Sequence, residues 1–129
     1  MVPVLRILRS VNPKAEELQT RTRRFLTRVI RFCESLPKTQ AAVMISGQLT
    51  RSAGGTDSNY RGACRARSRK EFIAKIGVCV EEADESLGWL KALTESEIGE
   101  PRERLALSDE ADELTAIFVA SEKTAKRKR

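Results

Sequence analysis

Residues 18–36, LQTRTRRFLTRVIRFCESL, decide the fold class of this 129-residue chain. Their inward positions recur at intervals of three and four residues, which is the period of a helix face packed against other helices. Glu16 and Glu17 fall in the first turn, where the helix dipole favours negative charge, and Pro37 disfavours helical geometry at Leu36. We therefore predict an amphipathic helix from Lys14 to about Leu36. Its inner face comprises Leu18, Thr22, Phe25, Val29, Phe32 and Leu36.

Three further segments keep the helical period, and none shows the alternation of a strand. The second predicted helix runs from about Lys38 to Ala53 and is broken by Gly54-Gly55, and the third covers about residues 59–93 with Asp57 or Ser58 as its N-cap. A fourth follows the connection Thr94–Pro101. The inner faces comprise Ala42, Ile45, Leu49 and Ser52; Tyr60, Cys64, Arg67, Phe72, Ile76, Cys79, Ala83, Leu87 and Leu90; and Leu107, Ala111, Leu114 and Phe118.

Four helices with short links predict an all-α, antiparallel up-down four-helix bundle over residues 14–122. Residues 1–13 form a predicted N-terminal arm, and residues 123–129 form a basic, solvated and mobile tail. Gly62, Gly77 and Gly88 lie inside the third helix, and two interpretations stay open. They are either simply tolerated there or mark a close approach of two helices.

The composition excludes several classes of function. The chain has no histidine, which rules out a Ser-His-Asp triad, a Cys-His dyad and a His-ligated metal. Its three cysteines form no C-x-x-C pair and are expected to be buried small hydrophobic residues. The S-x-x-K match at Ser35–Lys38 has no partner motif, and no apolar run reaches the ~18 residues that a membrane span needs. We expect a cytoplasmic protein that is not an enzyme and has no cofactor or metal.

The net charge of +6 hides a strong asymmetry along the chain. Residues 1–70 hold 15 basic and 4 acidic side chains, residues 71–122 hold 4 basic and 14 acidic ones, and residues 123–129 hold 5 basic ones. Such a division indicates either a nucleic-acid surface or docking between complementary faces.

Arginines repeat at helical intervals in two places. Four of them, spaced by three, four and three residues, lie on one predicted outward face of the first helix, and three more repeat every fourth residue early in the third. A row of guanidinium groups can follow a phosphate backbone, although solvated faces or ion pairs between subunits give the same pattern. The candidate nucleic-acid contacts are Arg21, Arg24, Arg28, Arg31, Arg61, Arg65, Arg69, Lys126 and Arg127.

Two polar clusters allow alternative interpretations. Glu81, Glu82, Asp84 and Glu85 flank an apolar face without a histidine, which favours a solvated or subunit-facing acidic stripe over a carboxylate metal site. That stripe would suit arginine-rich helices of a neighbouring subunit. The pair Asn59-Tyr60 either fixes the Gly-Gly turn by hydrogen bonds or is an ordinary helix cap.

Four stretches together resemble the 23S rRNA-intervening-sequence (S23-like) proteins: RTRRFLTRVIRFCESLPKT, GQLTRSA, NYRGACRARSRKEFIAKIGVCVEEADESLGWL and TAIFVASEKTAKRKR. The resemblance covers about residues 17–129 and implies a bacterial four-helix bundle that forms a ring-shaped homopentamer and associates with rRNA. Residues 1–13 have no counterpart. Gly54-Gly55-Thr56-Asp57 replaces a turn that contains Ser or Thr and Val in relatives, and its added acid counts against a phosphate contact there.

Two functions follow as expectations. The first is a non-catalytic, oligomeric protein associated with RNA or another nucleic acid. The alternative is a structural or adaptor homo-oligomer that binds a protein partner, with its arginine stripes docked on the acidic helices of neighbouring subunits.

Overall fold

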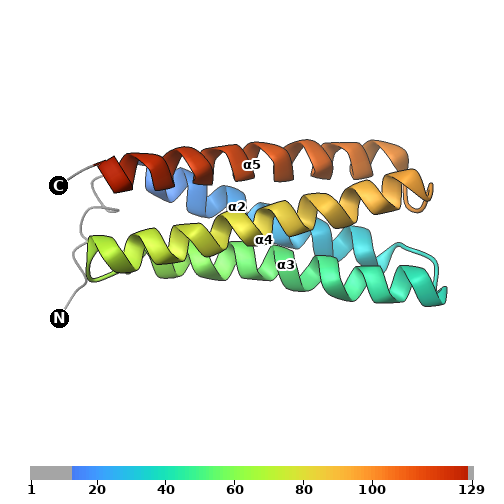
Figure 1. The fold of residues 1–129 in the computed structure, drawn as a ribbon. Coiled ribbons are helices and arrows are strands. Elements are labelled where there is room, and N and C mark those ends of the chain that lie inside the picture. Colours follow the sequence, from blue (N-terminus) through green and yellow to red (C-terminus); the bar gives the residue numbers. More distant parts are fainter. Residues whose placement is uncertain (1–12, 128–129) are drawn as a thin grey trace.

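The computed structural model describes residues 13–127, and all regular structure in that range is helical (Figure 1). Helices α2 (Pro13–Glu34), α3 (Gln40–Cys64), α4 (Arg69–Glu95) and α5 (Pro101–Arg127) run alternately up and down. Each helix packs against the next, and α5 returns to pack less extensively against α2. The predicted all-α up-down four-helix bundle is confirmed.

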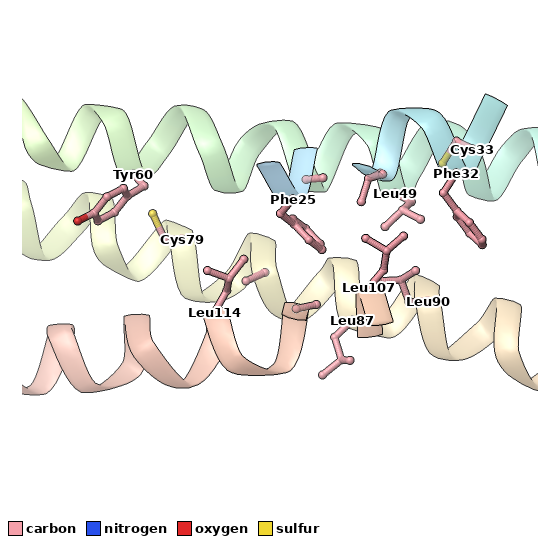
Figure 2. Close-up of a cluster of buried hydrophobic side chains, with 14 of the residues drawn as sticks. Phe25, Phe32, Cys33, Leu49, Tyr60, Cys79, Leu87, Leu90, Leu107 and Leu114 are labelled. Atoms are coloured by element: carbon pink, nitrogen blue, oxygen red, sulfur yellow. The ribbon is translucent and has the colours of Figure 1, made fainter. Parts of the chain in front are cut away.

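The core lies along the axis that the four helices enclose. All but three of the positions predicted to face inward are buried. Figure 2 shows apolar side chains from several helices meeting there, and the rings of Tyr60 and Phe118 lie 5.7 Å apart. Leu18 and Phe72 are partly buried against this core. Arg67 was placed wrongly, since its side chain is 82% exposed in the α3–α4 turn.

The boundary between the second and third helices was predicted wrongly. Helix α3 continues through Gly54-Gly55 to Cys64, and the chain turns at residues 65–68. Ser68 is the N-cap of α4, because its hydroxyl accepts a hydrogen bond from the Glu71 N–H at 3.0 Å. Ser68 and Glu71 have the spacing of a capping box, which is the local signal for this helix start. Asp57 therefore lies within α3 and caps nothing.

Gly55 lies within α3 where the Glu82 side chain of α4 comes close to it. A Cβ at this position would overlap the Glu82 carboxylate, with the Glu82 Cδ only 2.8 Å away. Beside it the buried hydroxyls of Ser52 and Ser86 lie 2.7 Å apart. At Gly77, one of the three glycines whose role was left open, a Cβ would lie 3.2 Å from Glu122 Oε2 of α5. Gly88 is merely tolerated, since a Cβ there would have no neighbouring atom within 4 Å.

The turn between α4 and α5 (residues 96–100) has an irregular backbone fixed by hydrogen bonds. Glu97 has a left-handed conformation with φ 55°, and Gly99 has φ 95°. Arg104, which is 9% exposed, donates from Nη1 to the carbonyls of Ile98 at 3.0 Å and Gly99 at 3.1 Å. This clamp holds the turn that the sequence placed at Thr94–Pro101.

Helix α5 includes the first five residues of the predicted basic tail, which are therefore helical. Residues 1–12 and 128–129 lie outside the described part of the chain, and so does nearly all of the predicted N-terminal arm. None of the described helices carries an apolar stretch capable of crossing a bilayer.

Candidate nucleic-acid interface

The four arginines of α2 divide into two pairs. Arg21 donates from Nε and Nη2 to the two carboxylate oxygens of Glu110 at 3.0 and 2.6 Å. Arg28 donates to Glu103 at 2.9 Å. These hydrogen bonds from α2 to α5 raise the pKa of both arginines. The four arginines were predicted to share one outward face. This is wrong for Arg21 and Arg28, which are seven residues apart and lie on the edge of α2 that faces α5.

The other two arginines of α2 remain at the surface. Arg24 and Arg31 are exposed, and neither makes an ion pair with any residue in the range 13–127. Their guanidinium groups are therefore the members of the stripe that an external phosphate can reach.

The remaining candidate residues meet at one end of the bundle. The antiparallel topology brings the end of α3, the start of α4 and the end of α5 together, at the left of Figure 1. No acidic residue occurs in residues 61–70 or 123–127, and we call the basic residues of these segments the basic end. The basic end comprises Arg61, Arg65, Arg67, Arg69, Lys70, Lys123, Lys126 and Arg127.

Acidic residues of neighbouring segments approach three members of the basic end: Arg61 lies 3.5 Å from the buried Asp57, and Arg67 and Lys126 form pairs at the surface. Arg67 and Glu71 lie 3.8 Å apart, and Lys126 and Glu122 lie 3.5 Å apart. Lys126 and Glu122 are four residues apart on α5, where an exposed ion pair contributes only about 0.3–0.5 kcal/mol. Arg67 lies in the α3–α4 turn with its side chain 82% exposed, so its pair with Glu71 is weak as well. Arg67 and Lys70 lie beside the predicted stripe of Arg61, Arg65 and Arg69, and Lys123 belongs to the predicted basic tail; the meeting of the three helix ends brings these two groups together.

The acidic stripe of α4 is partly satisfied within the chain. Arg51 of α3 pairs with Glu85 and lies 3.6 Å from Glu82. Burial raises the pKa of Glu82, whose Oε2 has no hydrogen-bond partner. The acidic stripe was expected to bind arginines of a neighbouring subunit. Glu82 and Glu85 already face Arg51 of the same chain, whereas Glu81 and Asp84 are exposed. Residues 13–127 contain no cluster of three potential metal ligands.

Asp57, the acid that was expected in a turn, is buried in α3 and 1% exposed. Its Oδ1 accepts a hydrogen bond from the Thr22 hydroxyl at 2.9 Å. Its Oδ2 accepts from Arg23 Nε at 3.0 Å and Nη2 at 2.7 Å, and Arg61 Nε lies 3.5 Å away. Arg23 was missed as a site residue because its role depends on contact with a residue 34 positions away.

Asn59 and Tyr60 lie in the last turns of α3, so neither caps a helix start. The Asn59 amide donates to the Gly55 carbonyl at 2.8 Å, along the helix. The buried Tyr60 hydroxyl lies 3.5 Å from the Ala15 carbonyl of α2. The three cysteines are buried, as predicted, and form no disulfide within residues 13–127; burial raises the pKa of Cys79 to about 12.

Exposed apolar side chains of α2 and α3 lie toward the opposite end of the bundle. Ile30, Val43 and Met44 are 40%, 55% and 52% exposed. Ile30 and Val43 line a groove of about 530 Å³ between α2 and α3. The fourth exposed large hydrophobic side chain of the described residues is Leu105 of α5, 62% exposed and near the same end.

Comparisons with known proteins agree with this architecture. The profile of the 23S rRNA-intervening sequence protein family matches residues 15–120. Among solved structures, the chain is similar to a protein of unknown function from the S23 ribosomal protein family of Bacteroides thetaiotaomicron. The two are 24% identical with a TM-score of 0.78, over 85% of this chain and 98% of that one, a likeness that shows the fold. No protein of curated function matches the sequence.

Proposed function

The chain belongs to the 23S rRNA-intervening sequence protein family, and on this premise we propose that it is a non-catalytic, oligomeric, RNA-associated protein. The basic end is the proposed RNA contact. The observation that carries the proposal is the meeting of residues 61–70 and 123–127, which hold no acidic residue, at one end of the bundle. Arginine forks suit phosphate oxygens, so the binding is driven by phosphate and sensitive to salt.

Charge reversal at the basic end tests this proposal. We expect the double variant Arg65→Glu, Lys126→Glu to weaken binding of a fluorescein-labelled rRNA fragment by at least tenfold at low salt, measured by fluorescence anisotropy. Two lost phosphate contacts should also lower the slope of log K against log salt by about 1.4 for single strands. Both residues are exposed, so the fold should be unaffected.

The matched control is Lys91→Glu, Arg102→Glu, which makes the same change in net charge with exposed residues near the other end. Equal weakening in both variants would mean that net charge rather than the basic end binds RNA. A wild-type protein that shifts no RNA at low salt would remove the proposal altogether.

Self-association, as the pentamer that the family resemblance implies, is the second part of the proposal. The exposed apolar side chains Ile30, Val43 and Met44 support it, because exposed apolar surface on soluble proteins commonly marks a contact surface where it is extensive. Leu105 projects from a different helix near the same end. A contact between two different faces is the kind that closes a ring.

Met44→Asp should therefore shift the protein from oligomer to monomer, because a carboxylate would lose its hydration in the contact. Sedimentation velocity measures this, with a loss of affinity of at least tenfold expected. Ala74→Asp, at another exposed helix position, is the control and should keep the assembly of the wild type. An oligomer that persists in Met44→Asp would place the subunit contact elsewhere.

The alternative is a structural or adaptor homo-oligomer that binds a protein partner and no nucleic acid. It is supported by the same exposed apolar side chains. It predicts that the oligomer forms and that no RNA binds at low salt. Docking of the arginine stripe on a neighbouring subunit is less favoured, since Arg21 and Arg28 bind glutamates of their own chain.

A further inference from the structure

A second basic surface lies in the groove between α2 and α3. The groove has a volume of about 680 Å³, and every residue that lines it is polar or charged. Arg23 and Arg24 approach from α2, and Asp57 and Arg61 approach from α3. Sites for drug-like or apolar ligands are lined mainly by hydrophobic side chains. This lining therefore suits a charged ligand.

Asp57 forms the buried floor of the groove and holds two arginines in place. Arg23 binds its Oδ2 through two N–H groups at 3.0 and 2.7 Å, and Arg61 approaches the same oxygen at 3.5 Å. The Arg23 and Arg61 side chains remain 53% and 40% exposed, so neither guanidinium is enclosed. One carboxylate thus holds two guanidinium groups in place, while the parts of both side chains that face away from Asp57 remain exposed.

The positive charge of the groove exceeds the charge of its acids. Arg23, Arg24 and Arg61 face two lining acids, Glu16 and Asp57. Arg24 has no ion-pair partner among residues 13–127, and the Arg61 side chain is 40% exposed although its Nε is buried beside Asp57. Several N–H donors on planar forks match the oxygens of a phosphate group.

We propose that this groove binds one phosphodiester group of a nucleic-acid strand, with Arg23, Arg24 and Arg61 as its ligands. The inference rests on the proposed RNA association and gives the RNA a second, defined contact. Arg61 belongs to both surfaces, since Arg65 of the basic end follows it by one helical turn. A strand seated in the groove therefore continues onto the basic end. Asp57 is a positioning residue that touches the arginines and not the phosphate.

Two variants test the groove without removing the floor. Arg24→Gln removes a charge that has no partner in the described residues, and Arg23→Lys keeps the charge opposite Asp57 but loses the planar fork. We expect each to weaken binding of a short fluorescein-labelled single-stranded RNA at least threefold. Arg24→Gln should also lower the slope of log K against log salt by about 0.7. Arg102→Gln near the far end is the control, and the thermal midpoint of Arg24→Gln should match that of the wild type.

The outcomes separate this inference from the function on which it rests. If both groove variants bind RNA as the wild type does while Arg65→Glu, Lys126→Glu binds weakly, the groove inference fails and the basic end stands. If the wild type binds no RNA, both fail. If inorganic phosphate raises the thermal midpoint of the wild type but not of Arg24→Gln, and RNA binding is unaffected by the variant, the groove takes free phosphate and the nucleic-acid assignment is overturned.

Discussion

Replacing Gly99 by alanine is expected to lower the free energy of unfolding by about 3 kcal/mol, through left-handed strain and overpacking together. Gly99 has φ 95°, a conformation that residues with a side chain rarely adopt. Its missing Cβ would lie 2.5 Å from Phe32 Cζ and 2.9 Å from Leu36 Cδ2. Phe32 and Leu36 are themselves buried, so neither can move away freely.

Urea denaturation of the two glycine variants measures this effect. Gly88→Ala is the matched control, because its Cβ would meet nothing within 4 Å and alanine favours the helix by about 1 kcal/mol. We expect the two substitutions to change stability in opposite directions. A Gly99→Ala protein as stable as the wild type would show that Gly99 does not pack tightly against Phe32 and Leu36.

The sequence was sufficient to predict which faces of the helices are buried. Intervals of three and four residues identify positions such as Val29, Ile76 and Leu114, because apolar burial follows the helical period whatever the neighbouring helix is. The same periodicity cannot locate a helix end, since a short turn can carry the pattern from one helix to the next. That is why residues 59–93 were predicted as one helix.

The turn predicted at Gly54-Gly55 does not exist, and the chain turns at residues 65–68 instead. Two adjacent glycines usually indicate a break, but Gly55 lies within α3 and faces the Glu82 side chain of α4. At residues 65–68 the chain turns without glycine or proline, and the signal is the Ser68–Glu71 capping box. The Ser68–Glu71 spacing is therefore a better indicator of where α4 begins than the Gly-Gly pair.

The candidate binding surface was predictable only in part. Helical spacing placed the arginines of α2 on one side, but whether each reaches solvent depends on α5, whose Glu103 and Glu110 bind Arg28 and Arg21. The basic end could be anticipated only from the topology, because its residues come from segments about 60 positions apart. The bundle prediction itself implies that the α3–α4 turn and the end of α5 lie together.

Replacing Arg23 by alanine is expected to lower the free energy of unfolding by about 2 kcal/mol. Asp57 is 1% exposed and would lose both N–H groups that bind its Oδ2, leaving the Thr22 hydroxyl and the more distant Arg61. Removing one partner of a fully buried ion pair costs about 3–5 kcal/mol. The loss here is smaller, since Arg23 is 53% exposed and is itself only partly desolvated.

The same argument predicts that a second substitution restores stability. Adding Asp57→Asn to Arg23→Ala removes the uncompensated charge, so the double variant should recover about half of the lost free energy even though it lacks both partners. Arg24→Ala is the control, since Arg24 is exposed and makes no ion pair with the described residues, and its stability should stay within about 0.5 kcal/mol of the wild type. Urea denaturation of the wild type, Arg23→Ala, Asp57→Asn and the double variant gives the coupling energy between Arg23 and Asp57. If the losses of stability of the two single substitutions simply add in the double variant, Arg23 does not hold Asp57 in place. The description of Asp57 as a rigid floor of the α2–α3 groove would then be wrong.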